Sequence, residues 1–227
     1  MLGVRKLFDA RNILALSLGV IACAAPSSAD ELPRDFVSLA DIAPAIKVDM
    51  RYYGSDNFTG KPVPGYLAAK CLLTRKAADS LRSAQDWLNK FQLRLVVYDC
   101  YRPTQAVKEF GRWASDLNDT KMKASHYPKV GKETLFRDGY ISHKSGHSRG
   151  STVDIGIEGL DMGAPFDFFD PISHTANSSI SQQARANRAL LSSALERVGF
   201  ENYAKEWWHF TVKSEQFPSQ YFDVPVK

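Results

Sequence analysis

Two histidines of this chain stand in surroundings that suit a metal ion, and each has an acidic residue nearby. His147 lies in the segment SGHSRGSTVD, seven residues before Asp154. His209 ends the segment EWWH, three residues after Glu206. Two imidazoles and one carboxylate, with a fourth position left to water, form the ligand set of a catalytic zinc site. The residue types therefore favour a zinc centre with His147, Asp154 and His209 as ligands.

Two further residues could complete hydrolytic chemistry at such a centre. Zinc lowers the pKa of a bound water to about 7, and Glu206 suits the role of the acid/base that moves the proton. Arg102 precedes Pro103, and the proline restricts the backbone of Arg102 to extended geometry. The guanidinium would then be held where the oxygen of the tetrahedral intermediate becomes negatively charged. A structural ion pair with Asp99 is the other interpretation of Arg102. In an ideal strand residues 206 and 209 point to opposite faces, so a bend or bulge is required between them.

The elements that must position these residues can be read from periodicity. Apolar residues at spacings of three and four predict three helices: over 74–91, from Pro103 to about residue 117, and over 182–198. Thr74 is the expected N-cap of the first helix, and Gly199 is expected to end the third. Short β-branched and aromatic runs predict strands at 48–53, 93–99, 151–157 and 207–212. Strands and helices do not alternate regularly. We therefore expect one α+β domain, with a mainly antiparallel central sheet flanked by helices and an active site on the sheet and loops.

Residues 118–146 lack a clear period and are rich in Lys, Ser, His, Tyr and Gly. A loop of this length in a compact domain is commonly a lid or a binding loop. We expect it to border the active site.

The first 29 residues are typical of a secretory signal, because Arg5, Lys6 and Arg11 precede an apolar run that ends in small residues. That run is too short to cross about 30 Å of hydrocarbon as a helix, so no stable membrane span is expected. Cys23 as the lipid-modified residue of a lipoprotein is the alternative. The predicted division is a signal at 1–29 and a catalytic domain at 30–227, exported to the periplasm.

Composition excludes several other classes. A 44% hydrophobic content in 227 residues is too high for disorder, and 29 basic against 25 acidic residues, without a run of like charge, gives no reason to expect a nucleic-acid partner. Beyond the signal the chain holds Cys71 and Cys100, which could form a disulfide or remain two buried thiols. His126, His143 and His174 are interpreted as structural residues.

Three motifs occur in an order that resembles one peptidase family. They are YRP at 101–103, SxHxxGxxxD at 145–154 and ExxH at 206–209. Together they resemble the zinc D-alanyl-D-alanine dipeptidases, the VanX-like family, and further similarity reaches 56–60, 139–140 and 166–174. The familiar alanine two residues before the ligand aspartate is Thr152 here.

The resemblance implies a role for each matching position. His147, Asp154 and His209 would hold one Zn²⁺ per chain, Glu206 would be the acid/base and Arg102 the transition-state cation. Ser145 and Tyr140 would contact the substrate, and Asp167 would bind its ammonium group.

The function expected from the resemblance is hydrolysis of a small D,D-dipeptide, D-Ala-D-Ala, to free D-alanine in cell-wall peptide turnover. A D,D-carboxypeptidase acting on peptidoglycan stem peptides is one alternative, and a non-catalytic zinc-containing wall-binding module is another. A non-haem iron oxygenase also uses two histidines and a carboxylate, but its usual first pair lies closer in sequence. The oligomeric state stays open.

Overall fold

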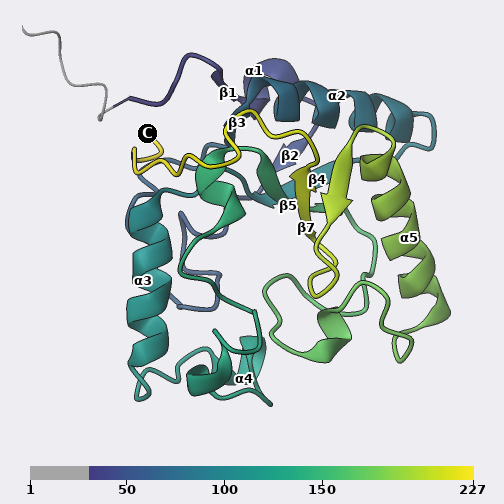
Figure 1. Cartoon of the computed structure of the whole chain (residues 1–227). Helices are drawn as coiled ribbons and strands as arrows, with labels where there is room; N and C mark the ends of the chain where they lie inside the picture. Colours follow the sequence, from purple (N-terminus) through teal and green to yellow (C-terminus); the bar gives the residue numbers. More distant parts are fainter. Residues whose placement is uncertain (1–30) are drawn as a thin grey trace, which may run out of the picture.

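The computed structural model describes residues 31–227. The predicted secretory signal at 1–29, including Cys23, lies outside the described residues. Figure 1 shows the described chain with its helices around a central sheet.

The central sheet has five strands in the order β2 (Lys47–Val48), β4 (Leu95–Asp99), β5 (Thr152–Ile157), β7 (His209–Val212) and β6 (Phe200–Asn202). β2 pairs with β4 in parallel, whereas β4, β5, β7 and β6 are joined by antiparallel pairings. A small second sheet pairs β1 (Phe36–Ser38) with β3 (Leu72–Thr74). The predicted α+β class with a mainly antiparallel sheet is confirmed, and the parallel pair makes the sheet mixed.

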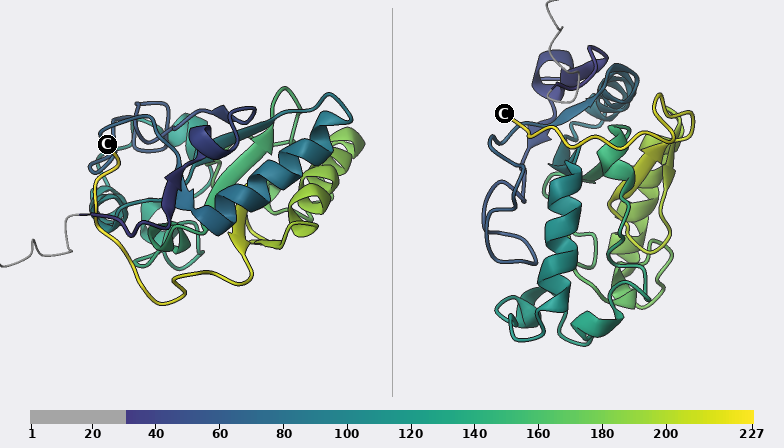
Figure 2. Two further views of the ribbon diagram at one scale, coloured as in Figure 1. Left: turned by 90° about the horizontal axis from the view of Figure 1, so that it is seen from above. Right: turned by 60° about the vertical axis from the view of Figure 1, so that its left-hand side comes forward.

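The longer helices surround the sheet on different sides. α2 (Arg75–Asn89) and α5 (Gln182–Glu196) run side by side, whereas α3 (Thr104–Ser115) stands apart from them (Figure 2). The shorter elements are α1 (Leu39–Ile42), α4 (Lys123–His126) and the 3-10 turns η1 (Lys132–Thr134), η2 (Gly146–Arg149) and η3 (Pro171–Ser173).

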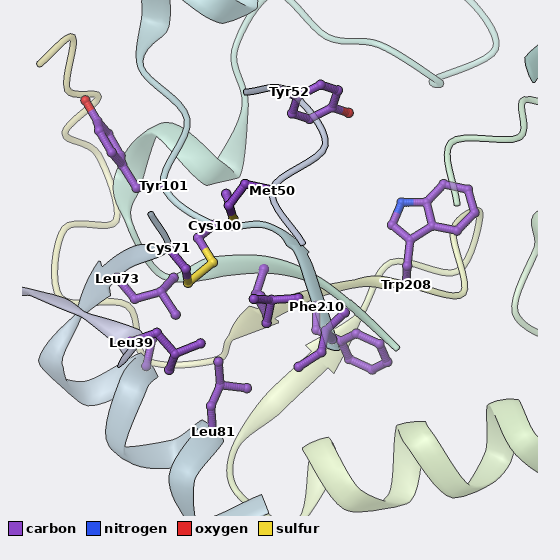
Figure 3. Close-up of a cluster of buried hydrophobic side chains, with 14 of the residues drawn as sticks. Leu39, Met50, Tyr52, Cys71, Leu73, Leu81, Cys100, Tyr101, Trp208 and Phe210 are labelled. Atoms are coloured by element: carbon purple, nitrogen blue, oxygen red, sulfur yellow. A yellow bond between two sulfur atoms is a disulfide. The ribbon is translucent and has the colours of Figure 1, made fainter. Parts of the chain in front are cut away.

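Side chains along the strands point alternately to the two faces of the central sheet, and one face carries the hydrophobic core. Val153, Ile155 and Ile157 of β5 are buried and share one face, because successive side chains point to opposite sides of a strand. Figure 3 shows Leu81 of α2 and Phe210 of β7 on that side, and Tyr52 and Trp208 on the other side of the strands. The residues between the core positions, including Asp154, therefore face away from α2.

Some predicted boundaries need correction. The strand predicted at 48–53 is wrong beyond Val48: residues 49–53 leave the ladder, although the amides of Asp49 and Arg51 still donate to carbonyl oxygens of β4. Pro103 occupies the N-cap position of α3 rather than its first turn. Thr74 is the N-cap residue of α2 as predicted, but its hydroxyl contacts that of Ser151 at 2.9 Å instead of capping the helix.

Cys71 and Cys100 form a disulfide (Figure 3). The bond joins the residue before β3 to the residue after β4, and it settles the choice between a disulfide and two free thiols. Within residues 31–227, every helix is too short or too polar to span a membrane.

Candidate metal centre and active site

The three residues predicted to bind metal meet at the end of two paired strands. Asp154 of β5 and His209 of β7 are direct partners in the antiparallel register, and Asp154 Oδ1 lies 3.0 Å from His209 Nδ1. His147 reaches them from η2, with its Nε2 3.2 Å from Asp154 Oδ1 and 3.3 Å from His209 Nδ1. One ligand atom from each residue lies within 4.8 Å of the other two. The three predicted ligands therefore converge on a single point.

The hydrogen-bonding of His147 makes it suitable as a ligand. Its Nδ1 lies 2.7 Å from the carbonyl oxygen of Cys100, which can only accept, so Nδ1 carries the proton and Nε2 keeps its lone pair. Ser145 Oγ accepts a hydrogen bond from the main-chain amide of His147, and Gly150 ends the turn at φ +80°. Two imidazole nitrogens and a carboxylate oxygen aimed at one point form a donor set that fits zinc.

Charge in the site agrees with a cation at that point. Burial raises the pKa of Asp154, but His147 and His209 outweigh burial and leave that pKa below its usual value. Burial lowers the pKa of His209 and thereby favours the neutral imidazole that a metal requires. The site thus favours an anionic carboxylate at Asp154 and a neutral imidazole at His209.

Glu206 lies beside His209 because a turn, not a strand, connects them. The amide of Glu206 donates to Tyr203 O, the amide of His209 donates to Glu206 O, and β7 begins only at His209. Glu206 Oε2 lies 3.5 Å from His209 Nδ1. The bend expected between residues 206 and 209 is present, and it turns both side chains toward one cavity.

The surroundings of Glu206 suit proton transfer. Burial, together with the charges of Asp154 and Asp167, raises the pKa of Glu206 well above its usual value. A carboxyl group whose pKa is moved toward neutrality can take up a proton and give it back. The position and the environment of Glu206 both fit an acid/base.

The ion pair between Arg102 and Asp99 is present, and the catalytic interpretation of Arg102 stays a prediction. Its Nε and Nη2 lie 2.9 and 2.8 Å from Asp99 Oδ2, and its guanidinium stacks 5.0 Å from the centre of the Tyr52 ring. The same Nη2 lies 3.5 Å from Asp154 Oδ2. The ion pair with Asp99 therefore holds a cation at the wall of the metal-binding cavity.

Asp99 comes to the site through an irregularity in β4. The register shifts between Val97 and Asp99, so that Val97 pairs with Ile155 while Asp99 pairs with Asp154. Strict alternation would put Asp99 on the core face with Val97, and the bulge turns it to the opposite face. Once there, the fully buried carboxylate accepts a hydrogen bond from Tyr66 Oη at 2.7 Å.

A cavity of about 290 Å³ adjoins the ligands. All eight residues predicted for the site line it: His147, Asp154, His209, Glu206, Arg102, Ser145, Tyr140 and Asp167. Residues 139–142 and 144–146 line it, so the segment 118–146 borders the site, as expected, through its C-terminal end. The roles of the individual residues stay predictions.

Asp167 is a buried acidic group in the lining of this cavity. Only 4% of the residue is exposed, and Tyr52 Oη donates a hydrogen bond of 2.8 Å to its Oδ2. Burial and the nearby charge of Asp154 raise the pKa of Asp167 well above its usual value. A buried carboxylate with room beside it is suited to a ligand that brings a positive charge.

Sequence reasoning missed several residues of the cavity. Tyr52 lines the cavity but is predicted only as part of a strand. Asp99 lies behind the lining, where it holds Arg102, and is predicted only as an ion-pair partner, because no local pattern reveals a contact made across the fold. The aromatic lining was not predicted either; it comprises Phe58, Phe110, Phe169, Tyr203 and Trp208. His126, His143 and His174 do not line the cavity; the His143 ring stacks on Phe136.

Two imidazoles and a carboxylate that can share an ion, beside a glutamate and an arginine in one cavity of an α+β domain, define a metallopeptidase. The family model for D-Ala-D-Ala dipeptidases, Peptidase_M15, matches residues 33–227. The chain belongs to this family, and family membership together with the His-Asp-His group confirms the expected zinc cofactor.

Curated relatives agree with the family assignment. The chain is 40% identical over 198 residues to a D-alanyl-D-alanine dipeptidase of Streptomyces coelicolor, covering 85% of this chain and 98% of the relative. A D-alanyl-D-alanine dipeptidase of Enterococcus faecium is 39% identical over the same shares of the two chains. That of Escherichia coli is 32% identical over 78% of this chain and 83% of its own.

One solved structure was also similar, at a lower level. It is a Glu→Ala variant of the vancomycin resistance D,D-pentapeptidase VanY in complex with Zn(II). The TM-score is 0.39 and the identity 16%, over 75% of this chain and 88% of that one.

Proposed function

We propose that this protein is an exported zinc dipeptidase that hydrolyses D-Ala-D-Ala to free D-alanine in cell-wall peptide turnover. The observation that carries the proposal is the cavity itself, in which Glu206, Arg102 and a buried Asp167 surround the His147, Asp154 and His209 ligand group.

In the proposed reaction His147, Asp154 and His209 hold the zinc ion. When bound, zinc supplies Lewis acidity that makes water acidic enough to lose a proton near pH 7. Glu206 takes the proton from the attacking water and later delivers it to the nitrogen of the leaving D-alanine. The distance of 3.5 Å between Glu206 Oε2 and His209 Nδ1 supports this role in both transfers.

Arg102 stabilises the charge that develops on the carbonyl oxygen during attack. Its guanidinium is fixed before the substrate arrives, because Asp99 holds one edge and the rings of Tyr52 and Phe110 lie against its face. A donor that needs no reorganisation at the moment of reaction stabilises the transition state most. Rigidity of this cation is therefore part of its function.

A free dipeptide is zwitterionic, and the cavity offers a group for each end. Asp167 binds the ammonium group, while the hydroxyl groups of Ser145 and Tyr140 are available to the carboxylate. Because the Asp167 carboxylate is buried, a longer peptide bound in the same way would have to place a neutral amide against it. This difference supports a dipeptide over a stem peptide as substrate.

Steady-state kinetics on D-Ala-D-Ala, its L,L, L,D and D,L isomers and a pentapeptide stem test the substrate. We expect release of D-alanine from D-Ala-D-Ala, its loss on zinc chelation and its return when zinc is restored. Preferential cleavage of the pentapeptide stem would instead make the protein a D,D-carboxypeptidase. Zinc binding without hydrolysis of any peptide would make it a wall-binding module.

Export is proposed from the predicted signal at 1–29 and is supported by the Cys71–Cys100 disulfide, since disulfides persist mainly in oxidising compartments. Fractionation of cells expressing the full chain tests this. We expect the processed protein in the periplasmic fraction; retention of activity in the membrane fraction, lost in Cys23→Ser, would favour the lipoprotein alternative.

A further inference from the structure

Asp167 is carried by the long connection between β5 and α5, residues 158–181. The regular structure of this described segment is one 3-10 turn, η3. A loop without its own ladder of hydrogen bonds needs contacts from other elements to keep one conformation. The contacts that other elements make with this loop therefore determine the position of the Asp167 carboxylate.

The backbone of Asp167 also needs outside support. Its φ of +57° lies in the left-handed region, which residues other than glycine adopt at a cost. Its carboxylate is buried as well. Two unfavourable features at one residue persist only where the surrounding structure enforces them.

Arg188 of α5 supplies that support from inside the protein, where 1% of it is exposed. Its Nε donates to Met162 O at 2.7 Å, on the chain before Asp167. Its Nη2 donates to Ile172 O at 3.0 Å and its Nη1 to His174 O at 2.7 Å, on the chain after Asp167. One side chain thus ties together the two ends of the segment 162–174.

The Arg188 guanidinium is charged, whereas its three hydrogen-bond partners are neutral carbonyl oxygens. Burial lowers the pKa of Arg188 to about 10, which reflects the cost of keeping the cation away from water. The guanidinium is planar and has five N–H donors in a fixed fork, so it can hold three carbonyl groups in set directions. No other side chain offers that geometry.

We propose that Arg188 is the positioning residue of the ammonium subsite, holding both ends of the segment 162–174 so that the Asp167 carboxylate faces the cavity. The inference rests on the proposed function, because it takes Asp167 as the group that binds the substrate's ammonium.

The test compares Arg188→Lys with the unaltered protein in two measurements on zinc-loaded protein. The first is KM and kcat for D-Ala-D-Ala, and the second is Ki of propionyl-D-alanine, the analogue without the amino group. We expect KM to rise about tenfold, with kcat and Ki changed by less than about twofold, because only the amino group depends on Asp167. Partial unfolding would lower kcat without this separation of KM from Ki.

Hydrogen exchange gives a readout independent of activity. In Arg188→Lys the amides of 162–174 should exchange faster than in the unaltered protein, while those of β5 and β7 keep their protection. Arg185→Lys, on the exposed side of the same helix, is the matched control and should change neither measurement. If Arg188→Lys does not fold, Arg188→Gln replaces it in both measurements.

Asp167→Asn distinguishes the ammonium-binding role of Asp167 from the positioning role of Arg188. If Asp167→Asn raises KM and leaves Ki unchanged, but Arg188→Lys alters KM and Ki by the same factor or not at all, the positioning role is overturned and the function stands. Unchanged exchange of 162–174 in Arg188→Lys overturns it as well. If the unaltered protein does not hydrolyse D-Ala-D-Ala, the proposed function and this inference both fall.

Discussion

His147 lies one hydrogen bond from the disulfide: its Nδ1 is 2.7 Å from the carbonyl oxygen of Cys100, whose sulfur is bonded to that of Cys71. The same short segment continues to Arg102, whose amide donates to His147 O at 3.3 Å. The disulfide therefore anchors the stretch of chain that orients one proposed metal ligand and carries the proposed catalytic cation.

Replacing both cysteines by serine should lower the free energy of unfolding by about 3–4 kcal/mol, because the bond closes a loop of 29 residues in the unfolded chain. Denaturant titration with and without a thiol reductant measures this. The reductant should shift the midpoint of the unaltered protein and leave that of the double variant unchanged. Equal midpoints for the two proteins under oxidising conditions would show that the bond adds no stability.

His209→Ala should lose bound zinc, because a centre with two protein ligands holds the ion far less tightly than one with three. Metal analysis after dialysis gives the zinc content per chain. His143→Ala is the control, since that ring stacks on Phe136 away from the cavity, and it should retain one zinc ion. Full zinc content in both variants would remove His209 from the ligand set.

Glu206→Gln should lower kcat on D-Ala-D-Ala by about 10²–10⁴-fold, because the amide cannot accept and return a proton. Zinc content and folding should stay unchanged, since the substitution keeps the shape of the side chain. Glu201→Gln, at an exposed position of β6, serves as the matched control. Near-normal turnover in zinc-loaded Glu206→Gln would refute the acid/base role.

Asp167→Asn should make the substrate-free protein more stable at neutral pH. The pKa of Asp167 is higher in the folded protein than in the unfolded chain. The contribution of its protonated form to the free energy of unfolding is therefore fully present below the pKa of the unfolded chain, and it is lost as pH rises through the pKa of the folded protein. The difference in free energy of unfolding between Asn and Asp should therefore grow with pH and approach zero in acid.

Thermal or denaturant unfolding at a series of pH values, at equal zinc content, measures that difference. Asp86→Asn changes an exposed carboxylate of α2 and is the control, with no comparable trend expected. A difference that shrinks as pH rises would contradict the assigned environment of Asp167.

Arg102→Lys should reduce kcat by about 10²–10³-fold with zinc retained, since an ammonium group cannot reproduce the planar contacts with Asp99 and the Tyr52 ring. Rates on D-Ala-D-Ala measure the effect, with the exposed Arg94→Lys as control. If kcat of Arg102→Lys stays within a few-fold of the unaltered value, charge alone is sufficient at this position.

The sequence predicted the helices better than the strands. The predicted helices over 74–91 and 182–198 correspond to α2 and α5 within two residues at each end, because a long apolar period survives small errors at its boundaries. The strand predicted at 48–53 is mostly irregular, since a short apolar run does not reveal where pairing stops. For the other predicted elements, glycine, proline and capping residues indicated where a helix or strand begins or ends only approximately.

What the sequence by itself determined is the chemistry: which imidazoles, carboxylates and guanidinium are present, and the motifs that contain them. These are local properties of residue type and spacing, so they could be read without a fold. The tertiary structure decided what depends on long-range pairing. The register of β5 with β7 joins Asp154 to His209, the bulge in β4 turns Asp99 toward Arg102, and the fold of 158–181 brings Asp167 under Tyr52. No local pattern encodes such contacts, because each depends on where distant segments pack.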